Sequence, residues 1–174
     1  MVRPCRRSGG AATWLRIRVR DPWFYVAAAR TAERRADPYH RDVVIREARR
    51  VVVVGYDRCE LLDIACVTSA LDVANRLGAT PAYEVVLATL RGASIRCDSG
   101  LEVTAQAQLE RVDPVLDTLV VSGGLGHVEA AADVHLRQHV RRLAATARRV
   151  SSVCTGASVL AAAELLNGRR ATTH

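Results

Sequence analysis

The sequence contains no lysine, and all 25 of its basic residues are arginine. It also lacks any hydrophobic run near the ~18 to 20 residues of a membrane helix, which argues against a transmembrane segment. The apolar stretch Trp23 to Ala29 is too short, and too closely preceded by charge, for a signal peptide. No C-x-x-C pair or repeated metal-ligand spacing is present, so neither a zinc site nor a disulfide framework is indicated. We expect a cytoplasmic protein that uses no metal and no cofactor. The five cysteines are Cys5, Cys59, Cys66, Cys97 and Cys154.

Positive charge is concentrated at the start of the chain. The first 50 residues hold 13 Arg against 5 acidic residues (net +8), whereas the other 124 hold 12 Arg against 13 (net −1). Residues 1–49 also show no sustained helical period and no strict alternation. We therefore predict an Arg-rich leader over 1–49, disordered or loosely attached, and a domain over 50–174. Such an arm could bind nucleic acid through phosphate contacts, although a disordered or spuriously translated leader explains the same composition.

From Arg50 onward, predicted strands alternate with predicted helices. Val51 to Val54 form a continuous β-branched run, typical of a strand buried on both faces. A hairpin is predicted around the turn at 98–100, with arms 94–97 and 101–104. The alternation indicates an α/β fold with an open, mostly parallel sheet, helices on both faces and a ligand site beyond the carboxyl ends of the strands. The strands are predicted at 51–54, 83–88, 118–121 and 150–153.

Three helices are predicted between these strands. The first carries one apolar stripe and ends at Gly78, and the second spans about 128–148 with Leu136, Val140 and Leu143 on one face. The third runs through Ser158 to Leu166. The stripe of the first helix consists of Leu62, Cys66, Ala70, Val73 and Leu77.

Cys154 lies where a predicted strand turns directly into a helix. The residues after it, Thr155, Gly156 and Ala157, are small, as a tight nucleophile elbow requires. The amide groups at a helix start stabilise negative charge on such a thiol. A buried structural cysteine explains the pentapeptide equally well.

Two more segments leave the carboxyl ends of predicted strands. Ser122-Gly123-Gly124 begins a glycine-rich turn whose amides could face a substrate oxygen, although such turns are common. It matches neither the dinucleotide fingerprint nor the phosphate loop, so nucleotide binding is not indicated. Asp63 stands at the start of the first helix. The helix dipole stabilises an acidic residue at such a position, so Asp63 can be explained without a role in a site.

Four motifs occur in order along this domain: Gly55-Tyr56-Asp57 with Leu61 to Ala65, Ser122-Gly123-Gly124, Ser152 to Ala157, and Arg170 to His174. Together they resemble the motifs of the DJ-1/PfpI superfamily, which is class I glutamine amidotransferase-like. The resemblance covers about 124 residues and is strongest to the N-terminal domains of AraC-type transcriptional regulators, a branch close to the isocyanide hydratases. It implies a flavodoxin-like three-layer α/β/α sandwich.

The resemblance also implies roles for individual residues. Cys154 would be the nucleophilic or oxidisable thiol, Asp63 the acid that hydrogen-bonds it, and His174 the nearby histidine. Amides near Gly124 and Thr155, with Gly123 beside them, would form the oxyanion or ligand-binding site. In the regulator branch such a pocket is thought to sense a small molecule, so the resemblance implies a small-molecule ligand for this chain. No membrane binding is expected. By analogy with the family, the domain would form a homodimer.

The sequence departs from the family pattern in two places. Cys66-Val67 replaces the usual Gly-Pro, and Ser69 replaces an expected acid. The family domain continues past the histidine, so C-terminal elements would be missing, and DNA binding by this chain alone is not expected. The predicted function is a truncated ligand-sensing domain of an AraC-type regulator without catalysis. The alternatives are an isocyanide-hydratase-like or other cysteine-dependent hydrolase or lyase, and an inactive remnant of a broken gene.

Overall fold

The structure is a computed structural model that describes residues 3–5, 13–18, 23–28 and 48–173. The chain divides into two compact units, residues 1–43 and 44–174. The first unit contains a three-stranded antiparallel sheet of β1 (Arg3–Cys5), β2 (Thr13–Arg18) and β3 (Trp23–Ala28). These strands were not predicted from sequence, although aromatic and β-branched residues favour extended backbone. The loose attachment of residues 1–49 stays a prediction.

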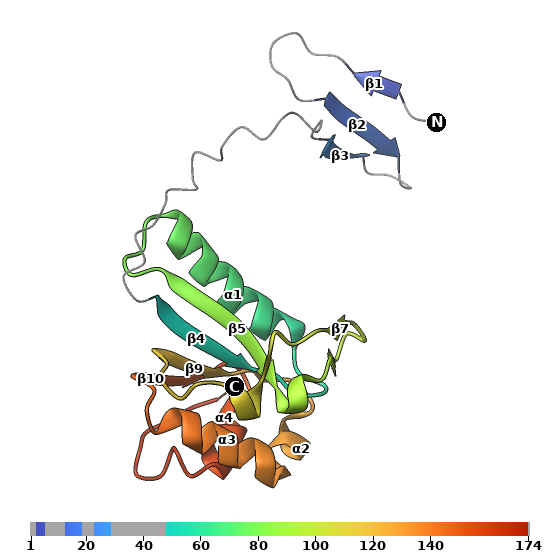
Figure 1. Ribbon diagram of the computed structural model, residues 1–174. Coiled ribbons are helices and arrows are strands. Elements are labelled where there is room, and N and C mark those ends of the chain that lie inside the picture. The colour runs from blue at the N-terminus through green and yellow to red at the C-terminus, as the bar shows by residue number, and fades with distance from the viewer. Residues whose placement is uncertain (1–2, 6–12, 19–22, 29–47, 174) are drawn as a thin grey trace. The chain divides into compact units, whose positions relative to one another are not determined.

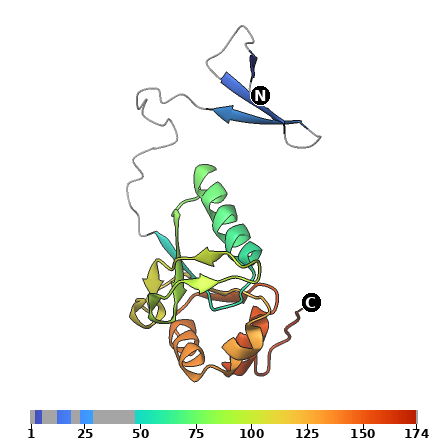
Figure 2. The same ribbon diagram turned by 90° about the vertical axis from the view of Figure 1, so that its right-hand side faces the viewer.

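The second unit is built on one parallel sheet with the strand order β10-β9-β4-β5-β8. Every pair of neighbours in it is parallel. Helix α1 (Leu61–Arg76) covers one face, and α2 (His127–Ala132), α3 (Val134–Ala144) and α4 (Gly156–Ala162) cover the other (Figures 1 and 2). The predicted α/β fold with a mostly parallel sheet is confirmed. The five strands are β4 (Arg49–Val54), β5 (Tyr83–Thr89), β8 (Ala107–Gln108), β9 (Thr118–Val121) and β10 (Arg149–Ser152).

Short elements connect β5 to β9 along the carboxyl rim of the sheet. Strands β6 (Ile95–Arg96) and β7 (Glu102–Val103) form the predicted antiparallel hairpin, which Gly100 turns at a φ of +84°. Two 3₁₀ turns, Leu90–Gly92 and Leu109–Arg111, flank this region. The hairpin therefore brings residues 94–98 alongside the loop that follows β4.

The apolar stripe predicted for α1 faces away from the sheet. Leu62, Val73 and Leu77 are 65%, 49% and 83% exposed, whereas Ile64 is buried and Leu71 packs against the core. The helix has apolar residues on both sides, so its periodicity alone did not identify the inward face. Its orientation is fixed by the Asn75 side chain, which accepts a hydrogen bond from the Tyr83 amide at 2.7 Å and donates to the Tyr83 carbonyl at 2.8 Å.

The single helix predicted over 128–148 is two helices. Asp133 breaks it by leaving helical geometry and accepting hydrogen bonds from the amides of His135 and Leu136, which caps α3. The predicted apolar face of α3 is confirmed, because Leu136, Val140 and Leu143 are all buried. The third predicted helix ends early, at Ala162, and Glu164 just beyond it has a φ of +62°.

No helix in the described part of the chain is long and apolar enough to cross a bilayer. The α1 side of the sheet is only partly covered. A groove of about 520 Å³ runs between α1 and the neighbouring strands β9 and β10, lined by Leu71, Val120 and Val150 among others. Val150, on the outermost strand, is 38% exposed.

Candidate functional site

Cys154 occupies the turn that joins β10 to α4. Its φ of +52° lies in the left-handed region, which is unfavourable for a residue with a side chain. The Val153 amide extends the strand pairing by donating to the Val121 carbonyl at 3.0 Å. Helix α4 then starts at Gly156, where a Cβ would lie 2.4 Å from the Val121 oxygen, so only glycine permits this approach. The backbone thus has the strained strand-to-helix turn that a nucleophile elbow requires.

Asp63 and Cys154 converge on Gly123. The Asp63 carboxylate accepts a hydrogen bond from the Gly123 amide at 2.9 Å. A Cβ built at Gly123 would lie 2.7 Å from both the Asp63 Oδ2 and the Cys154 Cβ, so the two side chains meet over this glycine. The start of α1 is held nearby because the Glu60 amide donates to the Gly123 carbonyl at 2.8 Å. The structure therefore brings together two of the residues predicted from sequence.

Gly124 and Thr155 bond directly to each other. The Thr155 hydroxyl accepts from the Gly124 amide and donates to the Gly124 carbonyl, both at 3.0 Å. The Cys154 Sγ lies 3.9 Å from the same hydroxyl oxygen. The amides of Gly123 and Gly124, predicted to face a substrate oxygen, are thus bonded to protein side chains.

Tyr56 belongs to this site, although the sequence analysis gave it no role. Its hydroxyl donates to the Ser122 carbonyl at 2.8 Å, and its side chain is buried. Burial raises the pKa of Tyr56 well above its usual range, and the nearby Cys59, Asp63 and Cys154 add to the effect. The position of Tyr56 two residues after the end of the buried strand β4 was a signal that could have identified it.

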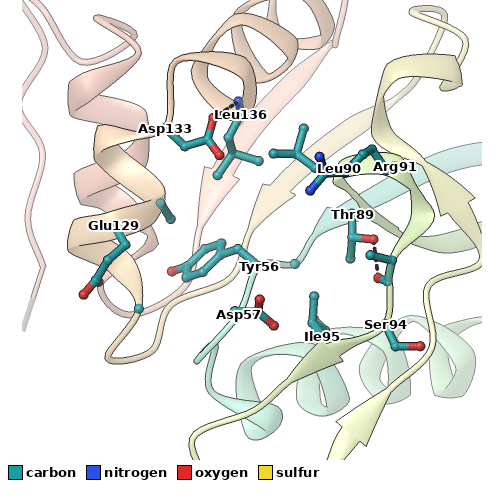
Figure 3. A pocket seen from close by; sticks show the side chains of 14 residues that line it. Tyr56, Asp57, Thr89, Leu90, Arg91, Ser94, Ile95, Glu129, Asp133 and Leu136 are labelled. Atoms are coloured by element: carbon teal, nitrogen blue, oxygen red, sulfur yellow. Dashed lines mark hydrogen bonds between the residues drawn. The ribbon is translucent and has the colours of Figure 1, made fainter.

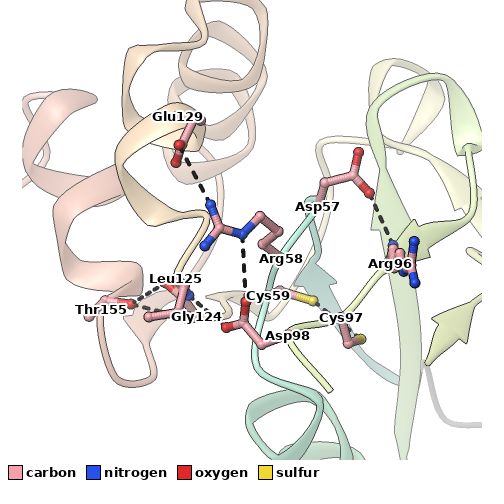
Figure 4. Close-up of polar contacts among 10 residues, drawn as sticks. All are labelled: Asp57, Arg58, Cys59, Arg96, Cys97, Asp98, Gly124, Leu125, Glu129 and Thr155. Carbon is pink, nitrogen blue, oxygen red and sulfur yellow. Dashed lines mark hydrogen bonds and ion pairs between the residues drawn. The ribbon is translucent and has the colours of Figure 1, made fainter. Parts of the chain in front are cut away.

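A polar network links three loops next to the elbow (Figure 4). The Arg58 guanidinium forms ion pairs with two carboxylates, with its Nε 3.9 Å from the Asp98 Oδ1 and its Nη1 3.8 Å from the Glu129 Oε1. The Leu125 amide donates a hydrogen bond to the Asp98 Oδ2 at 2.7 Å. The Arg96 amide donates to Asp57 at 3.0 Å. These contacts join the loop after β4, the β6–β7 hairpin and the glycine-rich turn.

A pocket of about 240 Å³ lies beyond the carboxyl ends of β4 and β5 (Figure 3). Its walls combine apolar groups such as Leu90 and Leu136 with the carboxylates of Asp57, Glu129 and Asp133 and with Arg91. Tyr56 also lines it, so one buried side chain contacts both this pocket and the backbone of the glycine-rich turn. This position agrees with the expected site beyond the strand ends, but the lining residues on α2 and α3 were not predicted.

Of the predicted site residues, His174 lies outside the described residues. The adjacent Thr173 hydroxyl donates to the Cys154 carbonyl at 3.0 Å, so the end of the described chain reaches the elbow. His127 begins α2, and its Nδ1 lies 2.8 Å from the Ser158 hydroxyl on α4. Among residues 3–5, 13–18, 23–28 and 48–173, no group of three or more His, Cys, Asp or Glu side chains could hold a metal ion.

The fold and the site together define a class of domain: a parallel α/β sheet with a cysteine in the strained turn between a strand and the following helix. The match to the DJ-1/PfpI family covers residues 49–174, and the chain belongs to this family.

Curated relatives differ in length and activity. An uncharacterized protein in the cpoL 5' region of Streptomyces lividans is 42% identical over 125 residues, which cover 72% of this chain and 86% of that protein. The isonitrile hydratase of Pseudomonas putida is 40% identical over 98 residues, 56% of this chain and 42% of the enzyme. The transcriptional regulator GbdR of Pseudomonas aeruginosa is 32% identical over 121 residues, 68% of this chain and 32% of the regulator. The chain thus spans less than half of the two relatives with a stated activity.

A solved structure of an AraC family transcriptional regulator from Pseudomonas putida is also similar. It superposes with a TM-score of 0.55 at 25% sequence identity, covering 69% of this chain and 63% of that one. The fold and the family are therefore shared with both regulators and an enzyme.

Proposed function

We propose that this chain is a cytoplasmic ligand-sensing domain of the kind found in AraC-type regulators, and that it does not catalyse a reaction. The regulator relatives support this assignment. We also propose that the Arg-rich residues 1–49 are a loosely attached leader, that the domain can form a homodimer, and that this chain alone does not bind DNA.

The observation that carries the proposal is the pairing of the Gly123 and Gly124 amides. A hydrolytic site needs donors aimed at the position where negative charge develops on the substrate. Here the Asp63 carboxylate and the Thr155 hydroxyl already accept these two hydrogen bonds. A substrate oxygen would have to displace them, which favours a site that binds over one that reacts.

The pocket of Figure 3 is the candidate ligand site. Its 240 Å³ suits a small molecule. Its three carboxylates outnumber Arg91, the one basic residue in the lining, which favours a ligand with a positively charged or hydrogen-bond-donating group. Tyr56 connects it to the elbow through the Ser122 carbonyl. A ligand that moves Tyr56 would therefore also disturb the Ser122 backbone, and through it the position of Cys154.

The test combines binding with recovery of the ligand. The full chain is screened by thermal denaturation against small amines, amides and carboxylates, and each hit is analysed chemically after prolonged incubation. We expect a hit that raises the melting temperature with concentration, as a ligand of the folded state must, and that is recovered unchanged. Asp133→Asn, which keeps a capping oxygen on α3, should weaken binding of a cationic hit, whereas Asp72→Asn on the exposed side of α1 should not. Conversion of the hit that depends on Cys154 would refute the sensing role.

The alternative is hydration of an isonitrile or another cysteine-dependent reaction. It is favoured by the strained backbone of Cys154 and by the 40% identity to an isonitrile hydratase. This alternative requires that a hydrogen bond from Gly123 to Asp63 or from Gly124 to Thr155 break when substrate binds, so that the amide can donate to the substrate.

A further inference from the structure

Cys59 and Cys97 face each other inside the carboxyl rim, apart from the elbow cysteine. Their Sγ atoms lie 3.8 Å apart, and the residues are 0% and 3% exposed (Figure 4). Cys59 follows β4, and Cys97 follows strand β6 of the hairpin, so the pair joins segments 38 residues apart in sequence. The structure holds both as thiols.

Backbone hydrogen bonds keep the two cysteines side by side. The Arg58 amide donates to the Arg96 carbonyl at 2.7 Å, and the Asp98 amide donates to the Cys59 carbonyl at 3.1 Å. These bonds flank the cysteine pair and keep its two segments together. Formation of an S–S bond of about 2.05 Å requires the two Sγ atoms, now 3.8 Å apart, to move closer.

The same two segments form part of the pocket wall and of the elbow's support. Residues 55–57 and 94–95 line the 240 Å³ pocket. Gly124 packs so closely against the turn at Cys59 that a Cβ there would lie 2.5 Å from the Cys59 carbonyl carbon. A covalent link between Cys59 and Cys97 would therefore fasten two walls of the pocket together next to the glycine-rich turn.

We propose that Cys59 and Cys97 form a redox-active dithiol that closes to an intramolecular disulfide. The two S–H bonds break and one S–S bond forms. Two electrons and two protons pass to a disulfide oxidant such as oxidised glutathione, which is reduced to two thiols. The reverse reaction with a dithiol reductant restores the structure described above.

Access to the pair is through the hairpin. Burial raises the pKa of the Cys59 thiol, and the adjacent Cys97 raises it further, so in the closed structure Cys59 is a poor nucleophile. The hairpin has only two residues in each strand and an exposed tip, with Leu101 59% exposed. Opening of this short element is the step that admits the oxidant, and it should make the reaction slower than oxidation of a surface thiol.

The test uses the full chain carrying Cys66→Ser, oxidised by a graded series of oxidised glutathione. Cleavage after arginine then releases Cys59 in residues 59–76 and Cys97 in residues 97–111, each as the sole cysteine of its peptide. We expect the two peptides to appear joined, with a mass lower by two hydrogen atoms than their sum. The joined peptide should disappear with dithiol reductant and in Cys97→Ser, and should persist in Cys154→Ser.

Two results would overturn the proposal. One is full recovery of Cys59 and Cys97 as thiols at oxidant concentrations that modify Cys154 completely. The other is a link from either residue to Cys154 instead. Oxidation in urea serves as the control, because in the unfolded chain the selective pairing should be lost.

Discussion

Two cysteine environments lie within one rim of this fold, and they are built differently. Cys154 is half-buried and holds a strained φ of +52°, with the Asp63 carboxylate from α1 and the hydroxyl of the adjacent Thr155 close by. Cys59 is fully buried in ordinary backbone and contacts a second thiol. The comparison indicates that strain and side-chain contacts mark a site for binding or chemistry, whereas burial and close backbone packing mark a structural pair whose reactivity depends on local opening.

Gly124 is the point where the two environments meet, so Gly124→Ala should have the largest effect. A Cβ would lie 2.4 Å from the Arg58 oxygen and the Glu60 nitrogen, and the φ of +126° excludes other residues. We expect the free energy of unfolding to fall by about 3 kcal/mol or more, measured by urea denaturation of the full chain. Gly100→Ala is the matched control. It has a φ of +84° and nothing within 4 Å, so only the backbone penalty of about 1 to 2 kcal/mol should remain. Equal losses for both variants would show that close packing at Gly124 is unimportant.

Asp63→Ala should have the next largest effect. It leaves the Gly123 amide without its acceptor, so we expect a loss of about 1 to 3 kcal/mol in the free energy of unfolding. Asp63→Asn keeps an oxygen at the same place and should lose much less. If the two variants are equally unstable, the carboxylate acts through its charge and not through this hydrogen bond.

Thiol reactivity measures the difference between the environments directly. With iodoacetamide at neutral pH, we expect Cys154 to label first among the five cysteines. Cys59 and Cys97 should react at least about tenfold more slowly, because they must wait for local opening. Peptide mapping over time gives the rates. Earlier labelling of Cys59 or Cys97 would refute the assignment of the elbow.

The smallest effect should come from Asp117, at the opposite end of β9. The hydrogen bond from Arg148 at 2.6 Å holds the pKa of Asp117 below its usual value, despite the opposing effect of burial. Its contribution to stability is therefore complete above the unfolded pKa of about 3.9 and is lost as pH falls through the lower folded value. The stability difference between the native chain and Asp117→Asn should shrink below about pH 4, as urea denaturation at several pH values would show. It should stay small because Arg148 is half exposed, and Cys154 labelling should not change.

Sequence predicted strands β4, β5, β9 and β10 because each of them carries a local signal, but it did not predict β1, β2, β3 or the two-residue β8. The buried run at Val51–Val54 and the turn at Gly100 need no tertiary information to be identified. Segments at the carboxyl ends of these strands were expected on one rim, and the structure brings Asp63, Gly123 and Cys154 together there.

The remaining features depend on contacts between distant segments. The inward face of α1 is set by the bonds between Asn75 and Tyr83, and the break at Asp133 by a capping side chain. Neither feature changes the apolar pattern. The hydrogen bond between the Gly124 amide and the Thr155 hydroxyl could not be predicted from sequence either, because it depends on how closely α4 approaches the glycine-rich turn.

The most direct test of the central claim is an assay for isonitrile hydration. The full chain and Cys154→Ala are incubated with an aliphatic isonitrile, and the N-substituted formamide formed by addition of water is measured by NMR. The Pseudomonas putida isonitrile hydratase serves as the positive control. We predict no formamide above the Cys154→Ala background, because the Gly123 and Gly124 amides are already bonded to Asp63 and Thr155. Formamide production that requires Cys154 would contradict the sensing role and identify the chain as an enzyme.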